Sequence, residues 1–196
     1  MIKPNGFEEV KEFGEYTPLT LGGHKLVIMK VEECTTSTGN QYIKVSFDTA
    51  KDDIQPNYYS NQYKQDTRTE KKWSGVTTVF PTDNEGKTSR AFKTFCTAVE
   101  HSNAGFKMVW GEQFCNALKG KAVGGVFGEE EYLNSSNEVK TAIKLRWFCG
   151  VNKVADATIP AKRTVDKDEA PAVPYFSSGY NYPNFEQVET DDDLPF

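Results

Sequence analysis

The sequence predicts a mainly β domain, a small and partly open barrel with one inserted α-helix at about residues 89–102, followed by an acidic C-terminal tail. Five segments before residue 150 have the composition and alternation of β-strands. One segment between them repeats apolar residues at helical spacing. From about residue 165 the chain keeps neither period, and 196 residues fit one domain of ordinary size with extensions.

The first two strands are predicted at residues 24–34 and 41–49. In HKLVIMKVEEC the alternation breaks step at Val31, and a β-bulge near Met29 and Lys30 would restore it. The turn TTSTGN then leads into QYIKVSFDT, whose alternation is unbroken. We therefore expect a bulged strand followed by a regular one.

The middle of the chain has a less regular pattern. Residues 50–75 form a long polar and aromatic connection that is compatible with a helix, a hairpin or a mobile loop. The stretch VTTVF at 76–80 predicts a short strand, which PTDNEG closes.

Two helices are predicted next. In residues 89–102 four apolar side chains recur at i, i+3, i+4 and i+7, which places them on one helix face. They are Phe92, Phe95, Cys96 and Val99. A second, short helix is predicted at 113–118, and Gly120 would end it.

Two further strands, at 121–132 and 138–149, predict a hairpin joined by LNSSN. One face of the second strand holds Val139, Thr141, Ile143, Leu145 and Trp147. This phase places Trp147 inside, with Ile143 and Leu145. The other face is polar and basic, with Lys140, Ala142, Lys144, Arg146 and Phe148.

The order of these elements suits the OB-fold, a five-stranded, partly open barrel that binds oligonucleotides across one sheet face. Other small barrels show a similar order. We divide the chain into a lead-in at 1–23, an OB-fold-like domain at 24–164 and a tail at 165–196. Four of the nine prolines lie in the tail among Ser, Gly, Asn and Tyr, so we expect the tail to be disordered.

Charge divides the chain at the same boundary. Residues 166–196 contain eight acidic side chains and one basic side chain, a net charge of −7. Residues 1–165 contain 22 basic and 20 acidic side chains. An acidic tail on a mildly basic body is a charge split that often marks nucleic-acid binders.

The cysteine pattern does not favour a metal site. Cys34, Cys96, Cys115 and Cys149 lack C-x-x-C spacing, and the chain has only two histidines. We therefore predict no metal or other cofactor, and free thiols in a reducing cytosol. The N-terminus MIKPNGFEEV has no apolar signal-peptide core, and no apolar run has the length of a membrane span. These features predict a cytoplasmic protein without membrane contact.

The chain ends in ETDDDLPF, which resembles the acidic C-terminal tip of bacterial and phage single-stranded-DNA-binding proteins (SSBs). The matching residues are Asp191, Asp192, Asp193, Leu194, Pro195 and Phe196. The resemblance implies that the tip binds replication, recombination or repair proteins. Independently, Phe196 combines an aromatic ring with a main-chain carboxylate, and the aspartates would speed the encounter with a basic partner surface.

The body, over about residues 15–150, is similar to a family of phage proteins from hosts of the Firmicutes type, thought to be OB-fold ssDNA-binding proteins. The similarity rests on KLVIMKVEE, STGNQYIKVSFD and YYSNQYKQDTRTEKKWSG. It implies a non-catalytic protein of a phage replication or recombination system, which acts in the bacterial host cytoplasm. Its implied role is to protect ssDNA without sequence preference.

Two regions combine the basic and aromatic side chains that sequence-independent ssDNA binding uses. The first is an outward set on two strands: Tyr42, Lys44, Lys140, Lys144 and Arg146. The second is the long connection, with Tyr58, Tyr59, Tyr63, Lys64, Arg68, Lys71, Lys72 and Trp73. The alternative for the second region is that Trp73 and one or two tyrosines cap the barrel while the lysines are simply solvated.

Three other functions stay open. The barrel could bind protein only, as an adaptor whose tail recruits host factors. It could be a metal-dependent nuclease, for which Asp48, Asp52, Asp53 and the run 129–131 offer carboxylates without an organising motif. RNA could replace ssDNA as the ligand. A homo-oligomer is also possible, because exposed edge strands can pair.

Overall fold

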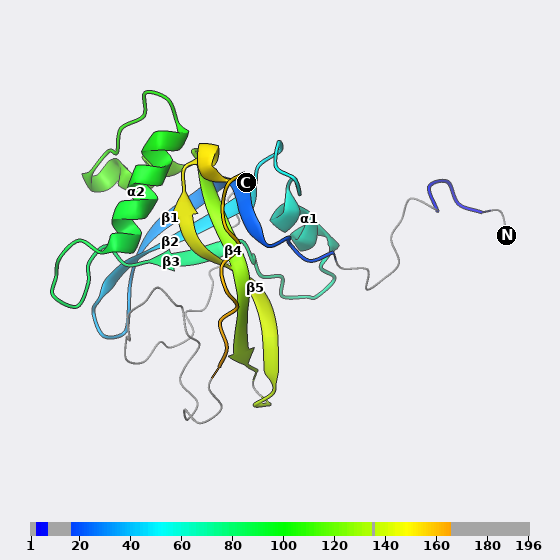
Figure 1. Ribbon diagram of the computed structural model, residues 1–196. Coiled ribbons are helices and arrows are strands. Elements are labelled where there is room, and N and C mark those ends of the chain that lie inside the picture. The colour runs from blue at the N-terminus through cyan, green and yellow to red at the C-terminus, as the bar shows by residue number, and fades with distance from the viewer. Residues whose placement is uncertain (1–2, 8–16, 135, 166–196) are drawn as a thin grey trace.

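The computed structural model describes residues 3–7, 17–134 and 136–165. Five strands form one antiparallel sheet in the order β3-β2-β1-β4-β5 (Figure 1). Their bounds are β1 Gly22–Thr35, β2 Gln41–Thr49, β3 Val76–Val79, β4 Ala122–Leu133 and β5 Val139–Cys149. The predicted mainly β architecture and the five predicted strands are confirmed. The predicted tail and its tip, 166–196, lie outside the described residues.

The sheet is not closed. Strands β3 and β5 are its two edges, and no strand pairs with their outer sides within the described part of the chain. Connection 50–75 contains helix α1, Tyr58–Gln65, and α2, Arg90–Ser102, separates β3 from β4. In Figure 1 these two helices lie on opposite sides of the strands, and the β4–β5 hairpin extends beyond them.

The bulge predicted in the first strand is confirmed. The register between β1 and β2 shifts between Ile28 and Lys30, so Met29 is the extra residue. On its other side, Ile28 exchanges backbone hydrogen bonds with the chain that enters β4: its N–H donates to Lys121 O at 2.9 Å, and its C=O accepts from Gly120 N at 2.8 Å. The bulge thus coincides with the point where β1 is bonded to the end of the helical insertion.

A second bulge was not predicted, and it changes the faces of the last strand. Val126 of β4 is opposite Trp147 while Phe127 is opposite Leu145, so Arg146 is the extra residue of β5. Leu145 packs against the core, whereas Trp147 is 45% exposed. The prediction that Trp147 points inside is therefore wrong, because an extra residue reverses the alternation beyond it.

Helix α2 confirms the predicted helix at 89–102. Ser89 is its N-cap, and the Ser89 hydroxyl accepts a hydrogen bond from Phe92 N at 3.1 Å. The buried face carries Phe95, Cys96, Ala98 and Val99. Phe95 meets Phe148 of β5 with ring centroids 4.8 Å apart. The helix therefore covers the β5 side of the core.

The second predicted helix is confirmed as α3, Phe114–Leu118, which follows a 3₁₀ turn at Gly111–Gln113. Leu118 is fully buried. Gly120 adopts a positive φ of 76°, as expected for a residue that ends a helix. A further 3₁₀ turn, Val151–Lys153, follows β5.

The core lies between the sheet and the helices. Phe47 of β2 contacts Phe127 of β4 with centroids 6.2 Å apart, and both side chains are buried. Burial of such a side chain contributes roughly 1.5–3 kcal/mol of transfer free energy. Core side chains come from all five strands and all three helices, so the helices and the open sheet form one packed unit.

The segment after β5 runs back along β4. Arg163 N donates to Glu129 O at 3.0 Å, and Glu131 N donates to Arg163 O at 2.8 Å. Nearer β1, a Cβ on Gly23 would lie 2.1 Å from the carbonyl oxygen of Val154, so a side chain there would displace the returning segment. The described chain therefore reaches Val165 close to the far half of β4.

Candidate nucleic-acid interface

A groove of about 570 Å³ lies between the two edge strands. Residues 76–80 of β3 and the following turn line one side, and residues 143–148 of β5 line the other. The groove is also lined by Arg90, Ala91 and Thr94 of α2 and by Tyr59 and Ser74 of the connection. The groove exists because β3 and β5 do not pair with each other, so side chains of both strands border an open seam.

The lining combines a ring with basic and hydroxyl groups. Trp147 is 45% exposed, Lys144 is half-buried, and Arg90 is exposed. Arg90 makes no ion pair with any residue that the structure describes. Thr77 and Thr78 add hydroxyl groups from β3. Cations that bind phosphates and a ring that stacks on bases are what sequence-independent ssDNA binding requires.

Arg146, a predicted DNA contact, lies in the groove but is committed to an ion pair. Its Nη1 lies 3.0 Å from Oε2 of Glu130, and the two side chains are only 6% and 9% exposed. Burial lowers the pKa of Arg146, nearby Arg163 lowers it further, and Glu130 opposes both. Arg146 therefore forms a wall of the groove, and its charge is largely balanced by Glu130.

The other predicted strand residues occupy different positions. Lys144 Nζ lies 5.9 Å from the centroid of the Tyr132 ring. Lys140, near the hairpin turn, pairs with Glu138 at 3.0 Å. Lys44 is half-buried and lies opposite Thr78 of β3, one strand away from the groove. Strands β2 and β5 belong to one sheet, but β1 and β4 lie between them, so these lysines do not form a single cluster across neighbouring strands.

Tyr42 does not present its ring to solvent. It is 3% exposed, and its ring lies 5.7 Å from that of Phe80. Burial is the main reason that the pKa of Tyr42 is raised, with Cys34 nearby as the next cause. The position predicted as an exposed stacking residue is therefore a packed one.

The first tyrosines of the connection also pack. Tyr59 is buried in the core, with its ring edge-on to Phe47 at 5.5 Å. The Tyr58 hydroxyl accepts a hydrogen bond from Leu19 N at 3.0 Å. Trp73 packs against the core and donates from Nε1 to Gly75 O at 3.0 Å. These three positions agree with the alternative that rings of this region cap the barrel.

A second, smaller depression of about 250 Å³ lies at the rest of the connection and shares Ser74 with the groove. Tyr63 lines it, 6.0 Å from Trp73 and with Lys71 Nζ 5.5 Å from its ring centroid. Lys64 and Lys72 are exposed nearby. The basic and aromatic residues of the connection therefore continue from one end of the groove.

Arg68 is less available than its exposure suggests. Its guanidinium donates to both carboxylate oxygens of Asp66, at 2.7–3.0 Å. These hydrogen bonds lower the pKa of Asp66 to about 2. A phosphate would have to compete with this carboxylate for Arg68.

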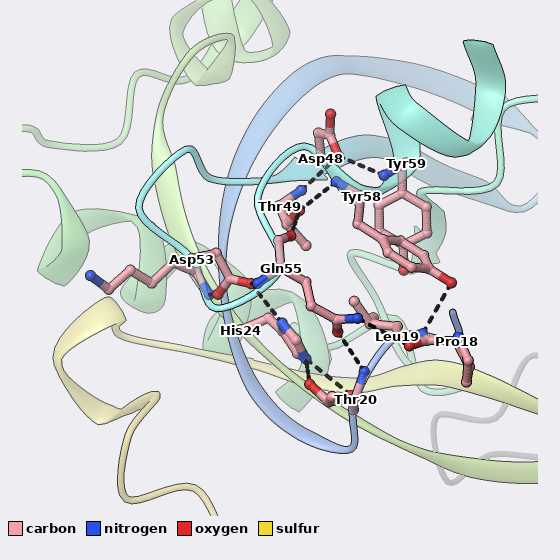
Figure 2. Close-up of polar contacts among 11 residues, drawn as sticks. Pro18, Leu19, Thr20, His24, Asp48, Thr49, Asp53, Gln55, Tyr58 and Tyr59 are labelled. Carbon is pink, nitrogen blue, oxygen red and sulfur yellow. Dashed lines mark hydrogen bonds and ion pairs between the residues drawn. The ribbon is translucent and has the colours of Figure 1, made fainter. Parts of the chain in front are cut away.

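The connection is fixed to the sheet by a polar network (Figure 2). Asp48, the penultimate residue of β2, accepts from Tyr59 N at 2.9 Å, from Ser60 N at 3.2 Å and from the Ser60 hydroxyl. A carboxylate at this place satisfies unpaired N–H groups of the first turn of α1 and complements the helix dipole. The start of α1 is therefore held by β2.

His24 and Asp53 form the second half of this network. Both side chains are buried, and His24 Nδ1 lies 2.8 Å from Asp53 Oδ2. Asp53 also accepts from Lys25 N at 2.7 Å and Gln55 N at 3.0 Å. Burial would raise the pKa of Asp53, but these hydrogen bonds together lower it. Figure 2 shows His24 between Asp53 and Thr20, so the network joins β1, the lead-in and the connection.

The carboxylates considered for a nuclease do not converge. Asp48 caps α1, Asp53 bonds His24, and Asp52 pairs with Lys25 at 2.7 Å. Glu130 lies elsewhere, beside Arg146. Among the residues that the structure describes, no three His, Cys, Asp or Glu side chains are placed to hold a metal ion together. All four cysteines are free thiols.

In comparisons with known proteins, neither a protein-family model nor a curated protein sequence matches this chain. None of the helices within the described ranges has both the length and the apolar character that crossing a membrane requires.

Two groove residues were missed from the sequence. Trp147 was assigned to the interior because a bulge at Arg146 leaves no mark in the alternation of side chains. Arg90 is not among the predicted site residues, since nothing local indicates that the start of the predicted helix 89–102 meets an open seam. The one local signal is a tryptophan near the end of a strand whose other face is basic.

Proposed function

We propose that this protein binds ssDNA without base preference in the groove between β3 and β5. The observation that carries the proposal is the composition of that groove: its lining includes a partly exposed indole at Trp147 together with Lys144 and Arg90, along an unpaired seam. Stacking on such a ring is worth roughly 1–3 kcal/mol per base and tolerates every base. The cations would neutralise phosphates, which adds affinity that depends on salt.

The topology supports an OB-fold-like assignment as part of the same proposal. Five antiparallel strands with an open seam, and a helix between the third and fourth strands, agree with a partly open, five-stranded barrel. Proteins of this fold class bind oligonucleotides on a sheet face flanked by loops. The groove adjoins strands β2 and β3 here, because β3 lines the groove and pairs with β2.

The tip at 191–196 supplies the second half of the proposal. It would recruit replication, recombination or repair proteins while the barrel holds ssDNA, in a phage system that works in a bacterial cytoplasm. The support is the resemblance of DDDLPF to SSB tips, together with its acidic charge and the aromatic ring of Phe196. Removal of Phe196 should abolish capture of such partners and leave ssDNA affinity unchanged.

The deciding experiment is a titration of the full chain with fluorescein-labelled oligo(dT) at low and high salt, followed by fluorescence anisotropy. We expect saturable binding that weakens steeply with salt. Oligo(dA) and oligo(U) of equal length test base preference and RNA. Absence of binding to all three would overturn the proposal and favour a protein-only adaptor. Loss of oligonucleotide length in magnesium, stopped by EDTA, would favour the nuclease.

A further inference from the structure

An aromatic cluster lies outside the groove, where the chain passes from α2 to α3. The Trp110 ring stacks on Phe114, with centroids 5.6 Å apart and 15° between the planes. Phe92 of α2 lies 6.2 Å from Trp110 and 5.9 Å from Phe114. Phe114 is buried, whereas Trp110 is 64% exposed. Protein therefore supports one side of the indole while much of the ring meets solvent.

This exposure is not explained by the fold. Neighbouring Val109 is also 41% exposed, so the two residues form an apolar patch on the surface. A ring that stays exposed contributes little hydrophobic free energy to folding, because little of its apolar area is removed from water. Exposed apolar patches commonly mark binding sites. The nearly parallel stacking on Phe114 holds the indole in one orientation, which lowers the entropy that a ligand would lose on binding to it.

The charge beside the cluster favours a polyanion. Arg90 and Lys93, in the first turn of α2, are exposed, and neither makes an ion pair with another described residue. They lie in the same first turn of α2 as Phe92, so two cations are carried by the helical turn that contributes a ring to the cluster. A ring with cations beside it matches the requirements of a nucleotide, with one base and its phosphates.

The cluster and the groove share the first turn of α2. Phe80 and Arg90 both line the groove. Ser89, the buried N-cap of α2, holds the two regions together at the start of the helix: its hydroxyl donates to Phe80 O at 2.5 Å and accepts from Phe92 N at 3.1 Å. A strand of nucleic acid that leaves the groove at Arg90 would therefore have to extend by about one turn of α2 to meet the aromatic cluster.

We propose that Trp110 is a second base-stacking site, used by the part of an ssDNA strand that extends past the α2 end of the groove. This inference rests on the proposed function and adds to it a separate subsite. It follows that only oligonucleotides longer than the groove use Trp110. The groove itself is short, since the five residues 76–80 span roughly 15 Å at strand spacing.

The test compares Trp110→Ala with wild type on oligo(dT) of about 4 and about 20 nucleotides, the first at the lower limit of OB-fold site sizes and the second above their upper limit of about 16. We expect affinity for the long oligonucleotide to fall by about 5- to 150-fold, the equivalent of one stacked base, with an unchanged salt slope. Affinity for the short one should change by less than about 2-fold. Trp110→Phe keeps a ring and should retain most of the affinity, and Val109→Ala is the control for the patch.

A readout that does not depend on the alanine variant is intrinsic fluorescence. The protein has three tryptophans, and the difference between wild type and Trp110→Phe isolates the signal of Trp110. The long oligonucleotide should quench that signal and the short one should not. Equal losses on both lengths, or no loss on either while wild type binds, would overturn the inference; the second result would favour protein docking at this patch. Failure of wild type to bind any oligonucleotide would instead reject the proposed function.

Discussion

Basic and aromatic side chains gather at two places, the groove between β3 and β5 and the connection 50–75, and the fold uses them differently. In the groove, Trp147 remains 45% exposed on a strand that is fixed by its ladder with β4. In the connection, Tyr59 is buried in the core and Trp73 packs against it. The two regions have similar composition, but only the first keeps its largest ring available to a ligand.

The difference arises from what each region must do for the fold. Connection 50–75 crosses from β2 to β3 and closes one end of the core, so its rings are used in packing. Gly75 shows how closely it approaches, since a Cβ there would lie 2.3 Å from the carbonyl oxygen of Phe47. Strand β5 gains its packing from Leu145 and Phe148, and the bulge at Arg146 leaves Trp147 outside.

The largest effect should come from removing charge at the groove side. We expect Arg90→Ala and Lys144→Ala in the groove, combined with Lys44→Ala on the adjoining strand β2, to lower ssDNA affinity about 100-fold at 0.1 M salt. This groove variant should reduce the slope of log K against log salt by about 2, at 0.7 per lost phosphate contact. The matched variant in the connection, with Lys64, Arg68 and Lys72 changed to Ala, should lose less, because Asp66 already engages Arg68. Anisotropy titrations from 0.05 to 0.5 M salt would measure both variants. If the connection variant showed the larger change in the slope of log K against log salt, the connection and not the groove would carry most of the phosphate contacts.

Removal of an aromatic ring should affect different properties in the two regions, ssDNA affinity in the groove and stability in the connection. Trp147→Ala should reduce ssDNA affinity by about 5- to 150-fold with an unchanged salt slope, since stacking releases no counterions. Its melting temperature should change little, because Trp147 is already 45% exposed. Tyr59→Ala should instead lower the free energy of unfolding by about 3–5 kcal/mol, as for a buried aromatic residue. Anisotropy would measure the ssDNA affinity of both variants, and calorimetry would measure their stability. A loss of stability in Trp147→Ala, or a loss of affinity in a still-folded Tyr59→Ala, would contradict this assignment of the two rings.

The sequence predicted most of the fold, because its elements have strong local signals. Alternation located β2, the break at Val31 revealed the bulge of β1, and apolar residues at helical spacing located α2. The candidate site was predicted less well. Exposure of Trp147 depends on one extra residue in β5, and burial of Tyr42 depends on Phe80, 38 positions along the chain. Neither contact has a local signal, so the sequence indicated the kinds of residues but not which of them are exposed.

The anchor of the connection offers a smaller and purely structural effect. Asp53→Asn removes a buried carboxylate that accepts from His24, Lys25 N and Gln55 N, and we expect a loss of about 1–3 kcal/mol of unfolding free energy at pH 7. The pKa of Asp53 is lowered in the folded state, so its contribution is present above the unfolded pKa of about 3.9 and is lost as pH falls through the folded pKa.

Urea denaturation at pH 7 and at pH 3 would therefore show the gap between wild type and Asp53→Asn narrowing in acid. An equal gap at both values would mean that the carboxylate charge is not what stabilises this network. Because Asp53 lies away from the groove, ssDNA affinity at pH 7 should stay within about 2-fold of wild type. A large loss of affinity would show that the connection contributes more to binding than its packed rings suggest.

The smallest effect concerns the tail, whose net charge of −7 gives it the sign of a nucleic acid. Such a segment can compete weakly for the same cations, so deletion of residues 166–196 should tighten ssDNA binding by about 3-fold at low salt. The gain should fade as salt shortens the Debye length from about 30 Å at 0.01 M to about 10 Å at 0.1 M. Combining the deletion with each triple variant shows which cations the tail binds. The gain in low-salt ssDNA affinity should persist in the connection variant and disappear in the groove variant. A gain that survives loss of Lys44, Arg90 and Lys144 would mean that the tail acts elsewhere, and an unchanged low-salt affinity after deletion would reject competition by the tail.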